Sequence, residues 1–227
     1  MIRAVLFDLD GLLFDTETLF LETVPQLLRQ RGMDVPQEVL KTMIGTDEKQ
    51  ELKLEAQYPG IRKVMKEYMD HRLYYFDRMF QTRGSADKKG LAQAIAYLEG
   101  HHLPYAIATG SYYEDIRHFL DHAGVALHPS VMVSSRSEHL PGKPSPAVFD
   151  VAASRMNVRS RDALVVEDGK YGIAAAKRGG FPSVFIEDHI VPDAEMRRNL
   201  QYQISDLSQL GDLIDDINRR HHGEKNL

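Results

Sequence analysis

Short apolar runs alternate with amphipathic stretches along most of the chain, and the two patterns predict strands and helices respectively. The apolar runs that predict buried strands are Ala4–Phe7, Tyr105–Ala108, Val131–Val133, Ala163–Val166 and Ser183–Ile186. The helical patterns that separate the later runs are Lys88–Leu98, Tyr112–Ala123, Pro146–Met156 and Tyr171–Arg178. This alternation predicts an α/β fold in which helices cover both faces of a parallel sheet.

One interval departs from the alternation. Roughly ninety residues separate the first predicted strand from Tyr105, far more than a single crossover helix needs. The interval contains no strand pattern, and its helical patterns are Glu17–Arg31, Pro36–Met43, Asp47–Gln57 and Ile61–Phe80. We therefore expect a separate helical bundle over residues 16–82, inserted into a core formed by residues 1–15 and 83–227. The alternative is a single larger domain with extra helices.

Local signals refine this picture. Pro25 is expected to kink the first inserted helix or to start a new one. Asp15 is interpreted as a turn or capping residue. Glu17 and Lys49 are expected on a solvated helix surface, and the alternative is that they reach a bound ligand from the inserted helices. The polar tail Arg219–Leu227 is expected to be frayed.

Composition excludes several classes of protein. With 43% hydrophobic and 27% charged residues, the 227-residue chain has an ordinary globular composition. Its net charge of -5 argues against a nucleic-acid partner, and the absence of cysteine excludes disulfides and thiolate metal sites. Asp8 and Asp10 interrupt the N-terminal apolar stretch, and no run of eighteen apolar residues occurs, so neither a signal peptide nor a membrane span is expected. We expect a cytoplasmic monomer.

Residues with useful chemistry follow three of the predicted strands, and a lysine stands before a predicted helix. These residues are Asp8, Asp10, Thr109, Gly110, Ser111, Lys143, Glu167 and Asp168. In a doubly wound sheet the segments that follow the strands open onto one crevice. The sequence therefore predicts a single site that combines four carboxylates, a lysine and hydroxyl or amide donors.

The sum of the charges at this site suggests a role for each group. Two like charges 4 Å apart repel by roughly 4 kcal/mol at an effective dielectric of about 20, so four carboxylates need cations. Lys143 supplies one positive charge, and an all-oxygen ligand set favours Mg²⁺. A phosphate dianion leaves the sum negative unless Asp10 is protonated, which makes Asp10 the candidate general acid and Asp8 the metal-bound nucleophile. Thr109 and the amides of Gly110 and Ser111 are the candidate phosphate donors.

The motifs resemble those of the haloacid dehalogenase superfamily of phosphohydrolases. The run from Phe7 to Glu17 looks like motif one, Thr109 like motif two, Lys143-Pro144 like motif three, and Glu167-Asp168 with Gly172 like motif four. The resemblance covers nearly the whole chain. It implies a Rossmann-like three-layer parallel-sheet core with an inserted all-helical cap, as in the β-phosphoglucomutase-like branch.

The same resemblance implies a magnesium site and an activity. In the family, Mg²⁺ is bound by the backbone carbonyl at the position of Asp10, by the carboxylates of Asp8 and Asp168, and sometimes by that of Glu167. Members that retain the second aspartate of motif one are phosphotransferases, so dehalogenation is not expected here. The expected function is a Mg²⁺-dependent phosphatase of a small phosphorylated metabolite, such as a sugar phosphate or a nucleotide-like compound, acting through an aspartyl-phosphate.

Two positions depart from the family pattern. Phosphosugar mutases of this branch usually carry a histidine near the start of the cap, where this chain has Phe20. The Pro-Gly that commonly precedes the helix after the cap is here Arg83-Gly84. The first departure favours a phosphatase over a mutase.

Two other functions remain open from the sequence. One is an intramolecular phosphosugar mutase. The other is a non-enzymatic phospho-switch or binding module, because receiver domains also place an acidic pair, an acceptor aspartate, a threonine and a lysine on a parallel sheet. Receiver domains are about half this length, and their acidic pair lies on a different strand from the acceptor, which counts against this reading.

Overall fold

The computed structural model of the chain describes residues 1–44, 48–187 and 192–223, without the side chains of residues 48–50, 222 and 223. Its contacts divide the chain into two compact units. The first, the core unit, combines Met1–Phe14 with Asp87–Leu227, and the second, the helical unit, is Asp15–Ala86. The sequence pattern puts the helical insertion at residues 16–82, which stays a prediction.

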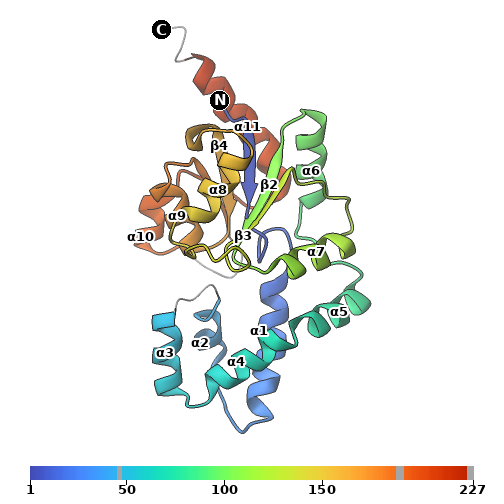
Figure 1. Ribbon diagram of the computed structural model, residues 1–227, viewed down its shortest axis with the longest axis vertical. Coiled ribbons are helices and arrows are strands. Elements are labelled where there is room, and N and C mark those ends of the chain that lie inside the picture. The colour runs from blue at the N-terminus through green and yellow to red at the C-terminus, as the bar shows by residue number, and fades with distance from the viewer. Residues whose placement is uncertain (45–47, 188–191, 224–227) are drawn as a thin grey trace. The chain divides into compact units, whose positions relative to one another are not determined.

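The core unit contains a six-stranded parallel sheet with the order β3-β2-β1-β4-β5-β6 (Figure 1). Its strands are β1 (Ala4–Phe7), β2 (Tyr105–Thr109), β3 (Val131–Ser134), β4 (Ala163–Glu167), β5 (Ser183–Ile186) and β6 (Tyr202–Ile204). The predicted fold class is confirmed, and five strands lie where the apolar runs indicated. The sixth was missed because it is three residues long and only Ile204 is buried.

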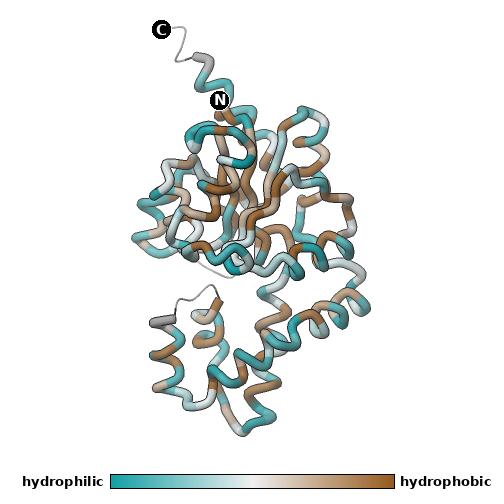
Figure 2. The backbone as a smooth tube through the Cα atoms, viewed as in Figure 1, coloured by the Kyte–Doolittle hydropathy of each residue, from teal (hydrophilic) through white to brown (hydrophobic). Residues whose placement is uncertain are grey.

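Helices pack on the faces of this sheet. They are α6 (Leu91–Gly100), α7 (Tyr113–His122), α8 (Ala147–Arg155), α9 (Lys170–Arg178), α10 (Ala194–Asn199) and α11 (Leu210–Gly223). One face is closed by α8 and α9, whose side chains, including Phe149 and Ala176, pack against alternate strand residues such as Leu6 and Val165. Apolar positions follow the strands through the centre of this unit (Figure 2).

Helix α11 corrects the expectation for the C-terminal tail. The residues from Arg219 to Gly223 continue this helix instead of fraying. Its apolar positions Leu210, Ile214 and Ile217 recur at helical spacing and are at most 3% exposed, so one face of the helix is anchored by burial. The last residues of the predicted tail, 224–227, lie outside the described residues.

The helical unit contains α1 (Thr16–Arg29), α2 (Gln37–Lys41), α3 (Glu48–Gln57), α4 (Ile61–Asp70) and α5 (Arg72–Arg83). Side chains including Val24, Leu28 and Ile61 form its own apolar core. The expected single helix over Ile61–Phe80 is two helices, because the chain leaves helical geometry at His71, where φ is -113°. Helix α1 continues through Pro25, so no new helix starts there.

Two backbone pairings lie where the chain leaves and re-enters the core unit. Within that unit, the amide of Lys88 donates to the carbonyl of Leu13 (2.9 Å). Within the helical unit, the amide of Asp15 donates to the carbonyl of Ala86 (2.8 Å). The two ends of the insertion are therefore fixed next to each other. Across the described ranges, no helix combines the length and the apolar character needed to cross a membrane.

Candidate active site

A tight loop after β1 presents the first two carboxylates. The amide of Asp8 donates to the carbonyl of Val166 on β4 (3.1 Å), which continues the strand pairing up to the first carboxylate. The chain then reverses at Gly11, whose φ of 73° strongly favours glycine, and the amide of Gly11 donates to the carbonyl of Phe14 (2.9 Å). The loop therefore holds Asp8 and Asp10 directly beyond the carboxyl end of the strand.

A second pair of carboxylates comes from the neighbouring strand. Strands β1 and β4 are adjacent where the strand order reverses, which is the position at which open α/β sheets bind ligands. The carboxylates of Asp8, Glu167 and Asp168 each contribute an oxygen to a group whose atoms all lie within 4.8 Å of one another. All three side chains are buried, with residue exposures of 7%, 2% and 4%.

Lys143 is the cation of this acidic group. Its Nζ pairs with Asp8 Oδ1 and with Glu167 Oε1, the latter at 2.5 Å, and lies 5.0 Å from the centre of the Phe149 ring. Burial alone would lower the pKa of this ammonium, but the charges of Asp8 and Glu167 outweigh burial and raise the pKa above its usual range. Lys143 therefore stays charged at every physiological pH.

Glu167 is held by several groups at once. Besides Lys143, its Oε2 accepts the backbone amides of Asp168 (3.1 Å) and Gly169 (3.0 Å). Burial raises the pKa of this carboxyl, and the charge of Lys143 opposes that shift. Gly172, in the first turn of α9, leaves the space that the carboxylate fills, because a Cβ there would overlap the carboxylate atoms. Steric exclusion of a side chain therefore explains why glycine occupies this position of the fourth motif.

Asp10 is anchored by the segment that follows β2. Ser111 Oγ donates to Asp10 Oδ2, and Thr109 Oγ1 lies 3.4 Å from the same oxygen. The amide of Ser111 donates to Thr109 Oγ1 (3.2 Å). The sequence named Ser111 for its amide alone, so the hydroxyl contact to Asp10 was missed. The amide of Gly110 as a phosphate donor stays a prediction.

Sequence reasoning also missed Ser134, at the end of β3. Its hydroxyl is fully buried, donates to the carbonyl of Ser111 (2.6 Å) and accepts the amide of Ser137 (3.0 Å). Ser134 thereby fixes the Ser111 loop against the next strand. The available signal was a polar residue directly after the apolar run Val131–Val133, the same signal that identified Thr109.

The carboxylate group fits a magnesium ion by the chemistry of its donors. All of its candidate ligands are oxygens, and Mg²⁺ prefers carboxylate and carbonyl oxygens over the nitrogen and sulfur ligands that suit zinc. Three buried carboxylates with one lysine also leave an excess of negative charge. A divalent cation at Asp8, Glu167 and Asp168 would relieve it.

Four predicted positions lie in the helical unit. Asp15 occupies the position before α1 but makes no side-chain capping bond, and its Oδ2 lies 3.8 Å from Arg83. Glu17 is only 8% exposed, so the expectation of a solvated surface was wrong: it lies on the buried side of the first turn of α1. Phe20 packs edge-to-face against Tyr68, with ring centres 5.5 Å apart. The side chain of Lys49 lies outside the described residues.

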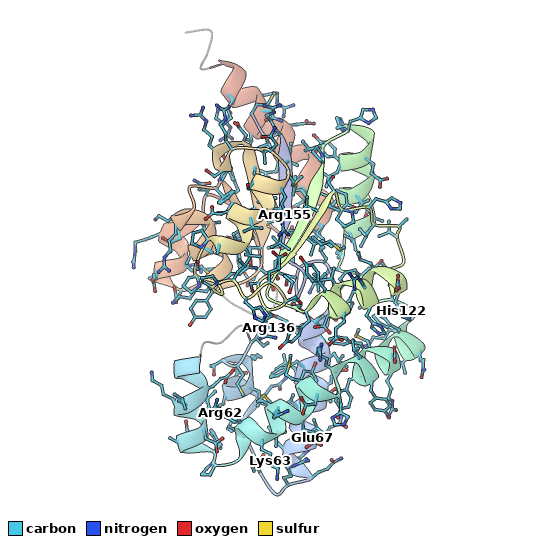
Figure 3. All side chains as sticks on the ribbon, in the orientation of Figure 1. Arg62, Lys63, Glu67, His122, Arg136 and Arg155 are labelled. Atoms are coloured by element: carbon cyan, nitrogen blue, oxygen red, sulfur yellow. The ribbon has the colours of Figure 1, made fainter. Side chains whose placement is uncertain are left out.

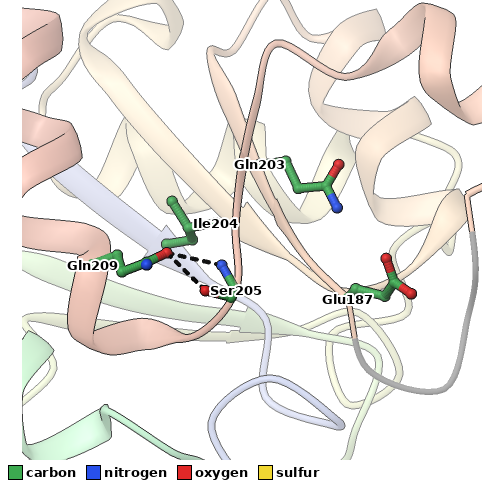
Figure 4. A pocket seen from close by; sticks show the side chains of 5 residues that line it. All are labelled: Glu187, Gln203, Ile204, Ser205 and Gln209. Carbon is green, nitrogen blue, oxygen red and sulfur yellow. Dashed lines mark hydrogen bonds between the residues drawn. The ribbon is translucent and has the colours of Figure 1, made fainter.

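A separate pocket of the core unit lies at the ends of β5 and β6. It is lined by Glu187, Gln203, Ile204, Ser205 and Gln209 (Figure 4). The amide and hydroxyl of Ser205 both donate to Gln209 Oε1, at 2.9 and 3.1 Å. None of the predicted site residues lines it.

Comparisons with known proteins find a matching family model, related sequences and structures of similar fold. Residues 5–186 match the family model of the haloacid dehalogenase-like hydrolases. A phosphorylated carbohydrates phosphatase of Thermotoga maritima is 23% identical over 85% of this chain and 88% of its own. (DL)-glycerol-3-phosphatase 2 of Arabidopsis thaliana is 28% identical over 82% and 80%. The crystal structure of β-phosphoglucomutase from Clostridium difficile shares the fold, with a TM-score of 0.77 and 17% identity over 97% of this chain and 99% of that one.

Proposed function

The chain belongs to the haloacid dehalogenase-like hydrolase family and is a phosphatase of phosphorylated small molecules, and we propose that it acts through an aspartyl-phosphate on Asp8 with Mg²⁺ as cofactor. The observation that carries the proposal is the position of the Asp8 carboxylate. It is buried beyond β1, paired with Lys143 and grouped with Glu167 and Asp168. A buried carboxylate that is held in place by an ammonium group in this way suits nucleophilic attack.

The reaction follows from the positions of the two aspartates. An Asp8 oxygen attacks phosphorus in line, and the bond from phosphorus to the substrate oxygen breaks. Asp10, protonated beforehand, gives its proton to the leaving alkoxide. Asp10 then takes a proton from water, which attacks the aspartyl-phosphate and releases inorganic phosphate and the Asp8 carboxylate. Ser111 and Thr109 orient the Asp10 carboxyl throughout.

The cofactor has a defined role in this scheme. Asp8 and Asp168, with Glu167 beside them, would hold Mg²⁺, and the family resemblance adds the backbone carbonyl of Asp10. When bound, the ion supplies positive charge that offsets the repulsion between the phosphoryl group and the carboxylates. Lys143 supplies the remaining positive charge from the protein itself.

A phosphosugar mutase is the second candidate, because a β-phosphoglucomutase shares the fold. A mutase must protonate and deprotonate the sugar hydroxyl at a second position, and a histidine in the cap usually serves this purpose in the family. Phe20 offers no titratable group, and its ring is packed against Tyr68. This favours transfer of the phosphoryl group to water.

The deciding experiment is turnover by the purified protein. We expect Mg²⁺-dependent release of phosphate from an aryl phosphate, lost on chelation and abolished in Asp8→Asn. Full activity in the Asp8→Asn variant would refute the aspartyl-phosphate mechanism. A long-lived phosphoenzyme without turnover would instead indicate a phospho-switch.

A second measurement separates the two enzymes. Incubation with β-glucose 1-phosphate and a trace of bisphosphate activator yields glucose 6-phosphate if the protein is a mutase, and only free phosphate if it is a phosphatase. A panel of phosphomonoesters compared by kcat/KM then narrows the substrate.

A further inference from the structure

Arg136 is an exposed arginine that has no carboxylate partner among the described residues. It belongs to the loop after β3, and Figure 3 labels it together with Arg155 of α8. Its guanidinium carbon lies 5.6 Å from the centre of the Tyr112 ring, and Tyr112 is itself exposed. Stacking on an aromatic ring orients a guanidinium while leaving its N–H donors open to a ligand.

Hydrogen bonds hold the loop directly after Arg136. Ser137 Oγ accepts the amide of Tyr113 (3.1 Å). Glu138 accepts two bonds from Arg155, at 2.8 and 2.6 Å, and a further one from the Tyr113 hydroxyl. The Arg155 contact lowers the pKa of Glu138, so that this carboxylate stays ionised and engaged. The exposed Arg136 is thus followed two residues later by an acidic residue, Glu138, that is already paired with Arg155.

This loop adjoins the segment that anchors Asp10. The amide of Ser135 donates to the carbonyl of Thr109 (2.9 Å), and Thr109 and Ser134 are paired across β2 and β3. Tyr112, whose ring lies beside the Arg136 guanidinium, directly follows Ser111, whose hydroxyl contacts Asp10. Asp10 is therefore linked to Arg136 by the Ser111 hydroxyl, by the peptide bond from Ser111 to Tyr112, and by the Tyr112 ring beside the guanidinium.

We propose that Arg136, oriented by Tyr112, binds a second anionic group of the substrate. The proposal rests on the proposed phosphatase function and narrows its substrate class to phosphomonoesters that also carry a carboxylate or another phosphate. Such substrates bring extra negative charge to a site that already holds Asp8, Asp10, Glu167 and Asp168 against Lys143. An arginine beside the Asp10 anchor supplies charge and a planar pair of donors that match either anion.

The first test compares substrates that differ in one anionic group. 3-Phosphoglycerate and glycerol 3-phosphate differ by a carboxylate, and fructose 1,6-bisphosphate and fructose 6-phosphate differ by a phosphate. Within each pair, we compare kcat/KM of the compound that carries the second anionic group with kcat/KM of the compound that lacks it. We expect Arg136→Ala to lower this ratio tenfold or more in at least one pair, through KM. The pair that responds identifies the anion. Arg136→Lys should restore part of the ratio, and added salt should reduce it in the parent protein.

The matched control is Arg161→Ala. This exposed arginine precedes β4, at the other end of the sheet, so the substitution removes the same charge far from the Asp10 loop. In Arg161→Ala, the kcat/KM ratio within each substrate pair should equal that of the parent protein. If Arg136→Ala leaves both ratios unchanged, or if Arg161→Ala lowers them equally, the proposal is overturned.

A binding measurement separates this proposal from the proposed function. Dissociation constants of the same four compounds are measured by calorimetry in the Asp8→Asn background, with and without Arg136→Ala. If the double variant binds only the compound with the second anionic group more weakly, the proposal is supported even if the parent protein shows no turnover. Equal binding of both partners with Arg136 present refutes it, whatever the catalytic result.

Discussion

Replacing Gly172 by alanine tests the arrangement of Glu167, because the new methyl group would occupy the space of the Glu167 carboxylate. The overlap is with the buried carboxylate itself, which is held by Lys143 and by two backbone amides. The carboxylate must therefore leave its place, and its three hydrogen bonds are lost together. The helix begins at Lys170, so Gly172 lies within it and no positive φ requires glycine there.

The magnitude follows from these contacts. Hydrogen bonds to a charged group contribute about 1.5 kcal/mol each at the lower end of their range, so three of them give about 4.5 kcal/mol. Alanine recovers about 1 kcal/mol through its higher helix propensity. We expect Gly172→Ala to lower the free energy of unfolding by about 3 to 4 kcal/mol, measured by urea denaturation. The freed Lys143 should also pair differently with Asp8, so kcat on an aryl phosphate should fall at least tenfold.

Gly169→Ala is the control in the same segment. A Cβ at Gly169 would meet Glu167 Oε2 at 3.4 Å, an ordinary contact, and its φ of -108° is accessible to alanine. The free energy of unfolding of this variant should lie within about 1 kcal/mol of that of the parent, because no group has to move. If Gly172→Ala were as stable and as active as Gly169→Ala, the steric explanation of Gly172 would be wrong.

Three further predictions address the cofactor, the proton carrier and the acid stability. Mg²⁺ at a hundredfold excess over its Kd should raise the free energy of unfolding by about 2.7 kcal/mol, and Asp168→Asn should remove most of that gain in thermal melts. Ser111→Ala should lower kcat about tenfold and Asp10→Asn at least a hundredfold, and an equal effect of both would contradict the assigned roles. Lys89 and Ser208 lower the pKa of Asp206 to about 2, so its contribution is full above about pH 4 and is lost as pH falls toward 2. Asp206→Asn should therefore have a lower urea midpoint than the parent at pH 6 and converge with it near pH 2.

Much of the core unit could be predicted because its strands are buried on both faces. Continuous apolar runs such as Ala4–Phe7 and Ser183–Ile186 have the same bounds in the sequence and in the structure. Strand β6 could not be found this way, because an edge strand with an exposed Gln203 has no continuous apolar run. Helix α11 was missed because its charged residues mask the spacing of Leu210, Ile214 and Ile217.

Part of the candidate site could be predicted from the strands, and part of it could not. The strand order places the carboxylates of Asp8, Glu167 and Asp168 together, and this proximity could be predicted from strand ends alone. Contacts that depend on loop geometry could not, as the Ser111 hydroxyl on Asp10 and the buried Ser134 show. The magnesium ion and the roles assigned to these residues remain predictions for the experiments above.

The pairing of Leu13 with Lys88, and of Asp15 with Ala86, has a consequence for folding kinetics. Strand β1 must find β2 across the whole helical unit, and closing an unstructured loop of about seventy residues costs roughly 4 kcal/mol of chain entropy. A helical unit that forms its own apolar core early would hold its two ends together and remove most of that cost before β1 and β2 pair. Early folding of the helical unit would then speed the pairing of β1 with β2. Substitutions in the core of that unit, such as Val24→Ala, would slow refolding of the parallel strands as well as destabilise the helices.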